Sequence, residues 1–322
     1  MAIGFFLFST SGSFPVCVAA SAIVGLSYGI AGVTAGALMI NSWFDKNVGL
    51  ALGISSAGSG MTSIIWPILI VPVIEGVSLG GAFIVQAVFI AVCALLTFFM
   101  VANRPGITDK LLANRVDTSI KAAGDRKGLL VVPRKVTVLF FIAIFMLGMV
   151  IFGITGFMSI VYSENFGGAV LGRLVSAYGI ALMVFKIAFG RLADKFGAEK
   201  AGFVMYIPLI VGLIGAPLAK NEIVAYITAL LIGMGSPISA VGAAIYAKDL
   251  ALPGIYGKVL TYLNITQVGA GLVLSLISGF IADALGSYMY VYFILAGAAV
   301  VMAVFIEITY IVRRKCLAAQ QQ

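Results

Sequence analysis

The sequence contains no histidine and few charged residues of either sign. Only 10% of its 322 residues are aspartate, glutamate, lysine or arginine, and three are cysteine. Without histidine the chain lacks the commonest general base and metal ligand. Of Cys17, Cys93 and Cys316, two lie within apolar runs, and nothing in their number or spacing suggests a CxxC site or a disulfide framework. We therefore expect no metal and no organic cofactor, and a membrane-embedded enzyme is the weakest alternative.

Polar sequence is also too scarce for a soluble fold. The chain is 62% hydrophobic, whereas soluble domains are about 45–50% apolar and about 25% charged. A bilayer-spanning helix needs about 20 mostly apolar residues, and none of the long runs alternates polar and apolar residues as a barrel strand does. The sequence therefore predicts an all-α integral membrane protein. The expected spans are 14–43, 48–73, 77–102, 136–162, 172–193, 198–219, 222–247, 257–283 and 287–312.

Positive charge is concentrated in two polar segments of a chain whose formal net charge is +8. Residues 104–135 are rich in lysine and arginine, and the tail carries Arg313, Arg314 and Lys315. Six expected spans separate the two segments, so both lie on the same side of the membrane. The positive-inside rule predicts that this side is cytoplasmic. The basic excess thus indicates a multi-pass protein, which we expect in a bacterial inner membrane, rather than a nucleic-acid partner.

Two weak internal similarities indicate a repeat of roughly 210 residues. "IVGLSYGIAG" at 23–32 is similar to "LIGMGSPISA" at 231–240, and "GISSAGSGM" at 53–61 to "NITQVGAGL" at 264–272. The first three spans therefore correspond to the last three, which predicts a helical bundle of two pseudo-repeated halves. The predicted division is an incomplete N-terminal half at 1–103 (the end of helix 3 and helices 4–6), a cytoplasmic linker at 104–135, and a six-helix C-terminal half with a cytoplasmic tail at 136–322.

The repeat also bears on the beginning of the chain. The apolar stub "MAIGFFLFS" corresponds to the end of span 198–219 and is too short to cross a bilayer. We expect a parent protein of about twelve helices, with two and most of a third preceding Met1, which leaves about nine complete spans here. A genuine nine-helix protein is the alternative.

Three stretches resemble a known transporter family. "GRLADKFGAEK" at 190–200 resembles the GxLaDrxGrk turn between helices eight and nine of the major facilitator superfamily. "NSWFDKNVGLALGISSAGSG" at 41–60 and "GKVLTYLNITQVGAG" at 257–271 are similar to its monocarboxylate-porter branch, which includes the oxalate–formate antiporter type. The resemblance implies secondary active transport by alternating access, with a substrate site near the bilayer midplane. A non-transporting fragment or sensor, or a transporter of another substrate, is the alternative.

The segment from Gly190 to Gly197 has two interpretations. The glycines should permit a sharp turn, and Asp194 should cap the helix that begins near Gly197 and pair with Arg191 or Lys195. The resemblance implies that these five residues form a conformational latch between cytoplasmic helix ends. A static charged loop is the alternative.

Lys186 is a lone cation inside an apolar run. A charge in hydrocarbon costs about 2.5–3.5 kcal/mol on insertion scales, so such residues usually face a bundle interior or a wet cavity. Lys186 lies four residues before Gly190, where carboxylate-transporting members carry a basic residue that contacts the anionic substrate. The resemblance therefore implies substrate binding, while snorkelling to the interface and a structural ion pair are the alternatives.

Four polar residues within the spans are further candidates for the substrate cavity: Tyr178, Tyr262, Asn264 and Gln267. Each serves equally well as a hydrogen bond between helices. Dicarboxylate exchangers of the family carry a second cation on helix eleven, which is missing here. We therefore expect a small monocarboxylate as substrate, with a coupled proton or an exchanged anion. A cation or drug exporter would instead need a buried acid.

Overall fold

The computed structural model describes residues 1–44, 46–100, 129–166, 168–252 and 255–318. Within these ranges the chain is helical, apart from short connections and one isolated antiparallel bridge between Leu130 and Ala251. Most of the predicted linker lies outside the described residues, so the predicted division of the chain into two halves and a linker stays a prediction.

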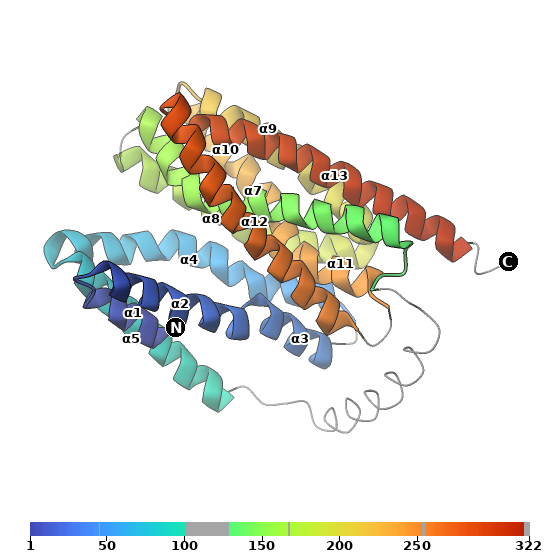
Figure 1. Ribbon diagram of the computed structural model, residues 1–322, viewed down its shortest axis with the longest axis horizontal. Helices are drawn as coiled ribbons and strands as arrows, with labels where there is room; N and C mark the ends of the chain where they lie inside the picture. Colours follow the sequence, from blue (N-terminus) through green and yellow to red (C-terminus); the bar gives the residue numbers. More distant parts are fainter. Residues whose placement is uncertain (45, 101–128, 167, 253–254, 319–322) are drawn as a thin grey trace. The chain divides into compact units, whose positions relative to one another are not determined.

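Short connections join consecutive described helices on either side of residues 101–133, which separate α5 from α7 (Figure 1). They are α1 (Ala2–Ser9), α2 (Phe14–Ala31), α3 (Val33–Trp43), α4 (Val48–Gly76), α5 (Leu79–Met100), α7 (Arg134–Phe166), α8 (Gly168–Phe196), α9 (Ala198–Leu218), α10 (Glu222–Gly235), the π-helix η1 (Ile238–Gly242), α11 (Ala243–Leu250), α12 (Tyr256–Leu285) and α13 (Met289–Ala318).

Eight helical segments of the described chain are long and apolar enough to cross a membrane. This confirms the all-α membrane fold, because a helix satisfies its own backbone groups in hydrocarbon. The expected span 14–43 is wrong as one continuous helix. It divides into α2 and α3 at Gly32, whose extended backbone (φ −79°, ψ −151°) interrupts the helical hydrogen bonds.

The helix boundaries follow the repeat seen in the sequence. The starts of α2 and α10, at Phe14 and Glu222, are separated by roughly 210 residues, and so are the starts of α4 and α12. Both copies are interrupted at corresponding places, the first at Gly32 and the second by Pro237 and η1. Proline has no N–H to donate, and the single π-helical turn that follows it is a rare local departure from the α-helix.

The described chain forms two compact units, and the second holds all the predicted site residues. The first unit comprises Met1–Trp43 and Ile65–Leu111, and in it α1 packs against α2 and α5. The second comprises Phe44–Ile64 and Leu112–Gln322. There α13 lies beside α7 and α9, α12 packs on α7, and α10 packs on both α8 and α9 (Figure 1).

Within the second unit the first half of α4 runs antiparallel to α8 at very close range. A Cβ atom added to Gly53 would collide with the carbonyl oxygen of Lys186, and one added to Gly190 would collide with that of Gly49. A Cβ on Gly60 would lie 2.8 Å from the carbonyl oxygen of Gly179. Small residues of this kind let membrane helices bring their backbones together. We call this contact, formed by Gly49, Gly53 and Gly60 against residues 179–190, the α4–α8 contact.

Gly53→Ala should destabilise the fold, whereas Gly58→Ala should not. The first substitution forces the α4 and α8 backbones apart, and overpacking of this kind costs about 1–3 kcal/mol. Gly58 lies on the same helix with nothing within 4 Å of an added Cβ, so alanine there should be neutral or stabilising by up to about 1 kcal/mol. Thermal unfolding of the two variants in detergent checks this. Equal melting temperatures would show that the α4–α8 contact is not tightly packed.

Candidate functional site

Lys186 lies in the α4–α8 contact and is 5% exposed. Its Nζ donates to the backbone carbonyl of Ser56 at 3.0 Å and to the hydroxyl of Ser59. Both acceptors belong to α4 and both are neutral. Within the described chain, no carboxylate forms an ion pair with Lys186, so the structural ion pair considered from the sequence is not seen.

The direction of the Lys186 side chain also argues against snorkelling. Along α4, Gly49 faces Gly190 and Gly60 faces Gly179, so Ser59 lies toward the N-terminal end of α8. Lysine stems on a helix lean in that direction. The ammonium therefore points away from the charged C-terminal end of α8, and about 15 Å of α4 separates Ser59 from Gly49. The side chain therefore does not reach toward the helix end at which snorkelling would bring the ammonium to an interface.

A buried ammonium held only by neutral oxygens has capacity for an anion. Lysine carries three donors, and Ser56 and Ser59 account for two of them. Desolvation of a charge is costly unless it is compensated by hydrogen bonds or an opposite charge. The positive charge of Lys186 is unneutralised by any described side chain within ion-pair distance. The arrangement is thus suited to an anionic ligand.

The hydroxyl groups of α4 were not among the residues selected from the sequence. Ser59 donates to the carbonyl of Ser56, Thr62 to that of Gly58 and Ser63 to that of Ser59. Their oxygens therefore keep lone pairs for other partners. Ser59 and Thr62 are exposed, so the hydroxyl row leads from the buried ammonium to open surface. The sequence feature that could have indicated these hydroxyl groups is the cluster of serine and threonine at 55–63 within an apolar helix.

Tyr178 and Lys186 share α8 but meet different neighbours. Tyr178 is 7% exposed, and its hydroxyl lies beside the side chain of Ser236, at the interruption between α10 and η1. A Cβ on Gly233 would lie 2.6 Å from the Tyr178 carbonyl oxygen. The tyrosine therefore joins α8 to the broken helix, about 12 Å along α8 from Lys186.

The three α12 candidates are positioned by the packing of α12 against α7. Gly148 of α7 approaches the backbone of Gln267, whose side-chain Nε2 is buried with no hydrogen-bond partner among the described residues. A buried donor without an acceptor is uncommon and marks a place for a water or a ligand. Asn264 is half-buried, and Tyr262 is 38% exposed with Lys258 Nζ 5.9 Å from its ring. The predicted residues thus form an α8 group and an α12 group.

Asp194 caps α4, not α9 as the sequence suggested. Its carboxylate accepts hydrogen bonds from the backbone N–H groups of Gly49 at 2.9 Å and Leu50 at 2.7 Å. These amides occupy the second and third positions of α4, where a local cap would normally supply the acceptor. Asn47, with φ +56°, ends the preceding connection in a left-handed conformation that asparagine tolerates. The carboxylate also faces the positive end of the α4 dipole.

The rest of the predicted latch also differs from the expected turn. Residues 190–196 are the last turns of α8, and Gly190 is a close-contact residue inside that helix. The reversal takes place at Gly197 alone, whose φ of +88° requires glycine. Asp194 forms no ion pair with Arg191 or Lys195 in the described structure, and Lys195 instead lies 5.1 Å from the ring of Phe196.

A cavity of about 1130 Å³ lies elsewhere in the second unit, along α7. None of the five predicted substrate-binding residues is among its described lining residues. The buried cation site and this larger cavity are therefore separate features.

Comparison with known proteins gives the family. The family model of the Major Facilitator Superfamily matches residues 1–215 and, in a second overlapping alignment, residues 140–320. The chain belongs to the major facilitator superfamily. No curated protein matches it. A chain of this superfamily is a membrane transporter that meets a lipid bilayer and a small-molecule substrate, and the family is generally non-enzymatic.

Asp194→Ala should expose the N-terminus of α4. Loss of a helix cap costs about 0.5–2 kcal/mol, so the melting temperature should fall and the amides of Gly49 and Leu50 should exchange faster with deuterium. Asp283→Ala is the matched control, because Asp283 is exposed on α12. Hydrogen exchange of peptides covering 44–52 measures the effect. Unchanged exchange there in Asp194→Ala would show that the carboxylate does not hold these amides.

Proposed function

We propose that this superfamily member is a secondary active transporter of small organic anions, of monocarboxylate type, and that Lys186 binds the carboxylate. The observation that carries the proposal is the Lys186 ammonium, which is buried and hydrogen bonded to Ser56 and Ser59 without a described counter-ion. A small carboxylate would supply the missing negative charge and accept the third N–H.

The residues around Lys186 favour a monovalent anion. Lysine presents a compact point charge rather than the bidentate fork of arginine, and the neighbouring α4 residues offer hydroxyl groups rather than further cations. We infer that Ser59, and Thr62 beyond it, contact the same anion after it enters from the exposed side. We propose Tyr178, Asn264, Gln267 and Tyr262 as further polar contacts, reached when the α8 and α12 groups enclose the substrate.

The proposed latch is the contact of Asp194 with α4. Hydrogen bonds to a charged group contribute about 1.5–3 kcal/mol each, so two of them favour one arrangement of α4 and α8 by a few kcal/mol. That is the size of bias expected for a two-state element. We infer that the contact forms in one access state and opens in the other. Gly190 and Gly197 shape the helix end, and Arg191 and Lys195 supply positive charge beside it.

The proposed topology follows the charge pattern. We propose that 104–135 is a cytoplasmic linker between an N-terminal half and the six-helix half at 136–322, and that the C-terminus is cytoplasmic. The coupling partner of the substrate is proposed to be a proton, in symport, or a second anion, in exchange. A bacterial inner membrane is the proposed location.

Lys186→Gln should weaken binding of small monocarboxylates. The purified chain is titrated with formate, acetate, lactate and oxalate while its melting temperature is recorded. The expected result is stabilisation of the unmodified chain by a monocarboxylate, with a loss of apparent affinity of at least about tenfold in Lys186→Gln, which corresponds to one charge-assisted contact. Lys200→Gln, at an exposed position of α9, is the matched control, and Lys186→Arg should retain part of the binding.

Flux measurements separate transport from binding alone. Proteoliposomes loaded with unlabelled anion are tested for uptake of the radiolabelled anion that stabilises the chain. Uptake that depends on Lys186 supports transport, whereas binding without uptake favours the sensor or fragment alternative. Binding that survives in Lys186→Gln would overturn the proposed role of the lysine.

A further inference from the structure

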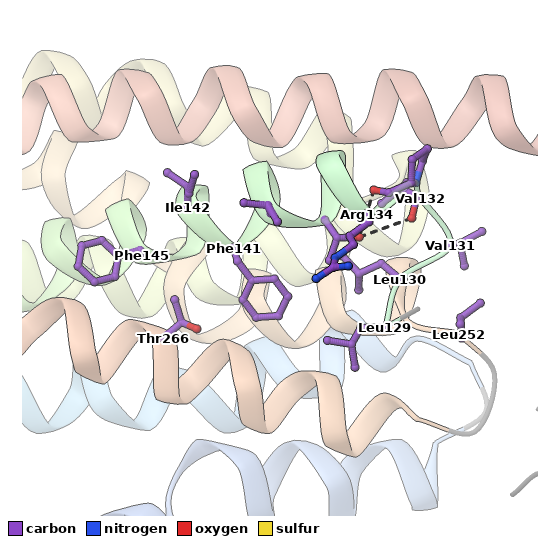
Figure 2. Close-up of a pocket in the computed structure, with 13 residues that line it drawn as sticks. Leu129, Leu130, Val131, Val132, Arg134, Phe141, Ile142, Phe145, Leu252 and Thr266 are labelled. Carbon is purple, nitrogen blue, oxygen red and sulfur yellow. Dashed lines mark hydrogen bonds between the residues drawn. The ribbon is translucent and has the colours of Figure 1, made fainter. Parts of the chain in front are cut away.

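A groove of the second unit runs along the first half of α7 (Figure 2). Its volume is about 1130 Å³. Its walls come from the segment before α7, from one face of α7, and from single residues before and within α12. We call it the α7 groove. Its lining residues are Leu129, Leu130, Val131, Val132, Pro133, Arg134, Thr137, Val138, Phe141, Ile142, Phe145, Leu252 and Thr266.

Helical spacing gives the groove its length. The lining residues of α7 recur at three- and four-residue intervals from Arg134 to Phe145 and so form one face. The twelve residues from Arg134 to Phe145 extend about 16 Å along the helix. Because the candidate membrane span begins at Arg134, we expect the groove to run from the membrane interface into the hydrocarbon. Figure 2 shows Phe141 and Phe145 along the groove and Arg134 toward the end formed by the preceding segment.

The wall at the interface end is fixed by backbone hydrogen bonds. The N–H of Val131 donates to the carbonyl of Leu250 at 2.9 Å, and the N–H of Leu252 donates to that of Leu129 at 3.3 Å. These bonds tie the segment before α7 to the end of α11. The groove therefore has a defined wall at this end.

Among the described lining residues, Arg134 carries a charge, two are threonine and the other side chains are apolar. The two threonines donate their hydroxyls to backbone carbonyls, Thr137 to Pro133 at 3.3 Å and Thr266 to Tyr262 at 2.8 Å. Arg134 is exposed and forms no ion pair with any carboxylate of the described chain. A ligand that fits has a negative head and a long apolar tail. A small carboxylate would leave most of the apolar lining residues without contact to the ligand.

We propose that the α7 groove binds an anionic phospholipid, with its phosphate at Arg134 and an acyl chain along Val138, Phe141 and Phe145. Arginine matches phosphate geometry through paired N–H donors, and basic pockets between membrane helices recognise anionic headgroups. The membrane supplies this ligand wherever α7 crosses it. The site is independent of the carboxylate proposed at Lys186 and requires only that α7 spans the bilayer.

A second groove of the same unit provides a built-in comparison. It has a volume of about 400 Å³ between α8 and α10 and is lined by Ile180, Ala181, Val184, Phe185, Ile227, Leu230, Leu231 and Met234. The described residues of this lining are all uncharged. It should accept acyl chains without regard to the headgroup.

Native mass spectrometry of the purified chain tests the lipid site. The chain is titrated with phosphatidylglycerol and with phosphatidylcholine of identical acyl chains. We expect one phosphatidylglycerol molecule to be retained in preference to phosphatidylcholine, and Arg134→Gln to reduce that preference about fivefold, the effect of one basic residue near an anionic lipid. Lys200→Gln, outside the groove, should leave it unchanged. Equal retention of the two lipids by the unmodified chain would overturn the proposal without any variant.

A second pair of variants tests whether the acyl chain occupies the groove. Val138→Trp fills the α7 groove, and Val184→Trp fills the comparison groove; the two valines are 53% and 49% exposed. Only Val138→Trp should remove the preferred phosphatidylglycerol. Loss in neither variant, or equal loss in both, would contradict binding in the groove. Displacement of phosphatidylglycerol by equimolar oleate would assign the site to a free fatty acid and overturn the phospholipid assignment.

Discussion

The close approach of the α4 and α8 backbones is the constraint on which the candidate site depends. Glycine at positions 49, 53 and 60 removes the side chains that would hold the two helices apart. The same approach brings the carbonyl of Ser56 and the hydroxyl of Ser59 within reach of the Lys186 ammonium. At a greater separation the lysine would be a buried cation without acceptors, which is an expensive arrangement in a membrane. The close packing at these glycines is therefore also what allows the Lys186 ammonium to be buried with hydrogen-bond acceptors.

The α4–α8 contact joins two electrostatic interactions that sequence distance separates. Lys186 donates to the middle of the α4 segment, and Asp194 accepts from its first turn. Because α4 is continuous between these points, a displacement of α4 along or away from α8 disturbs both interactions together. An anion that draws the ammonium away from Ser56 and Ser59 would weaken the contact that Asp194 closes at the other end. In that case the anion site and the contact that opens would both depend on the position of α4. Such a shared element is what couples a binding site to a conformational equilibrium.

The fold could be predicted from the sequence largely because the backbone N–H and C=O groups must be hydrogen bonded within the protein in hydrocarbon, which restricts membrane spans to helices and closed barrels. The apolar runs predict the spans, and the repeat predicts that helices in the two copies start at corresponding positions. The break at Gly32 could not be predicted, because glycine is also common in uninterrupted membrane helices. The partner of Asp194 was missed for a different reason. Local capping rules point to the next helix, whereas the amides that it accepts from belong to Gly49 and Leu50, about 145 residues earlier. The serine and threonine residues of α4 can be seen in the sequence, but only the packing of α4 against α8 shows that they lie beside Lys186.

Two cations of this chain differ in ways that determine which anions they suit. Lys186 is buried, its reach is limited by the α4–α8 contact, and its neighbours are hydroxyl and carbonyl oxygens. Such surroundings favour a small, strongly hydrated anion, since polar neighbours replace the water that the anion gives up. Arg134 is exposed at the end of a long apolar groove. There, in the binding we propose, burial of a hydrocarbon tail would supply most of the favourable energy, and the cation would select an anionic head. In a chain with so few charges, the environment of each cation rather than the net charge is therefore the basis on which we propose a different anion for each.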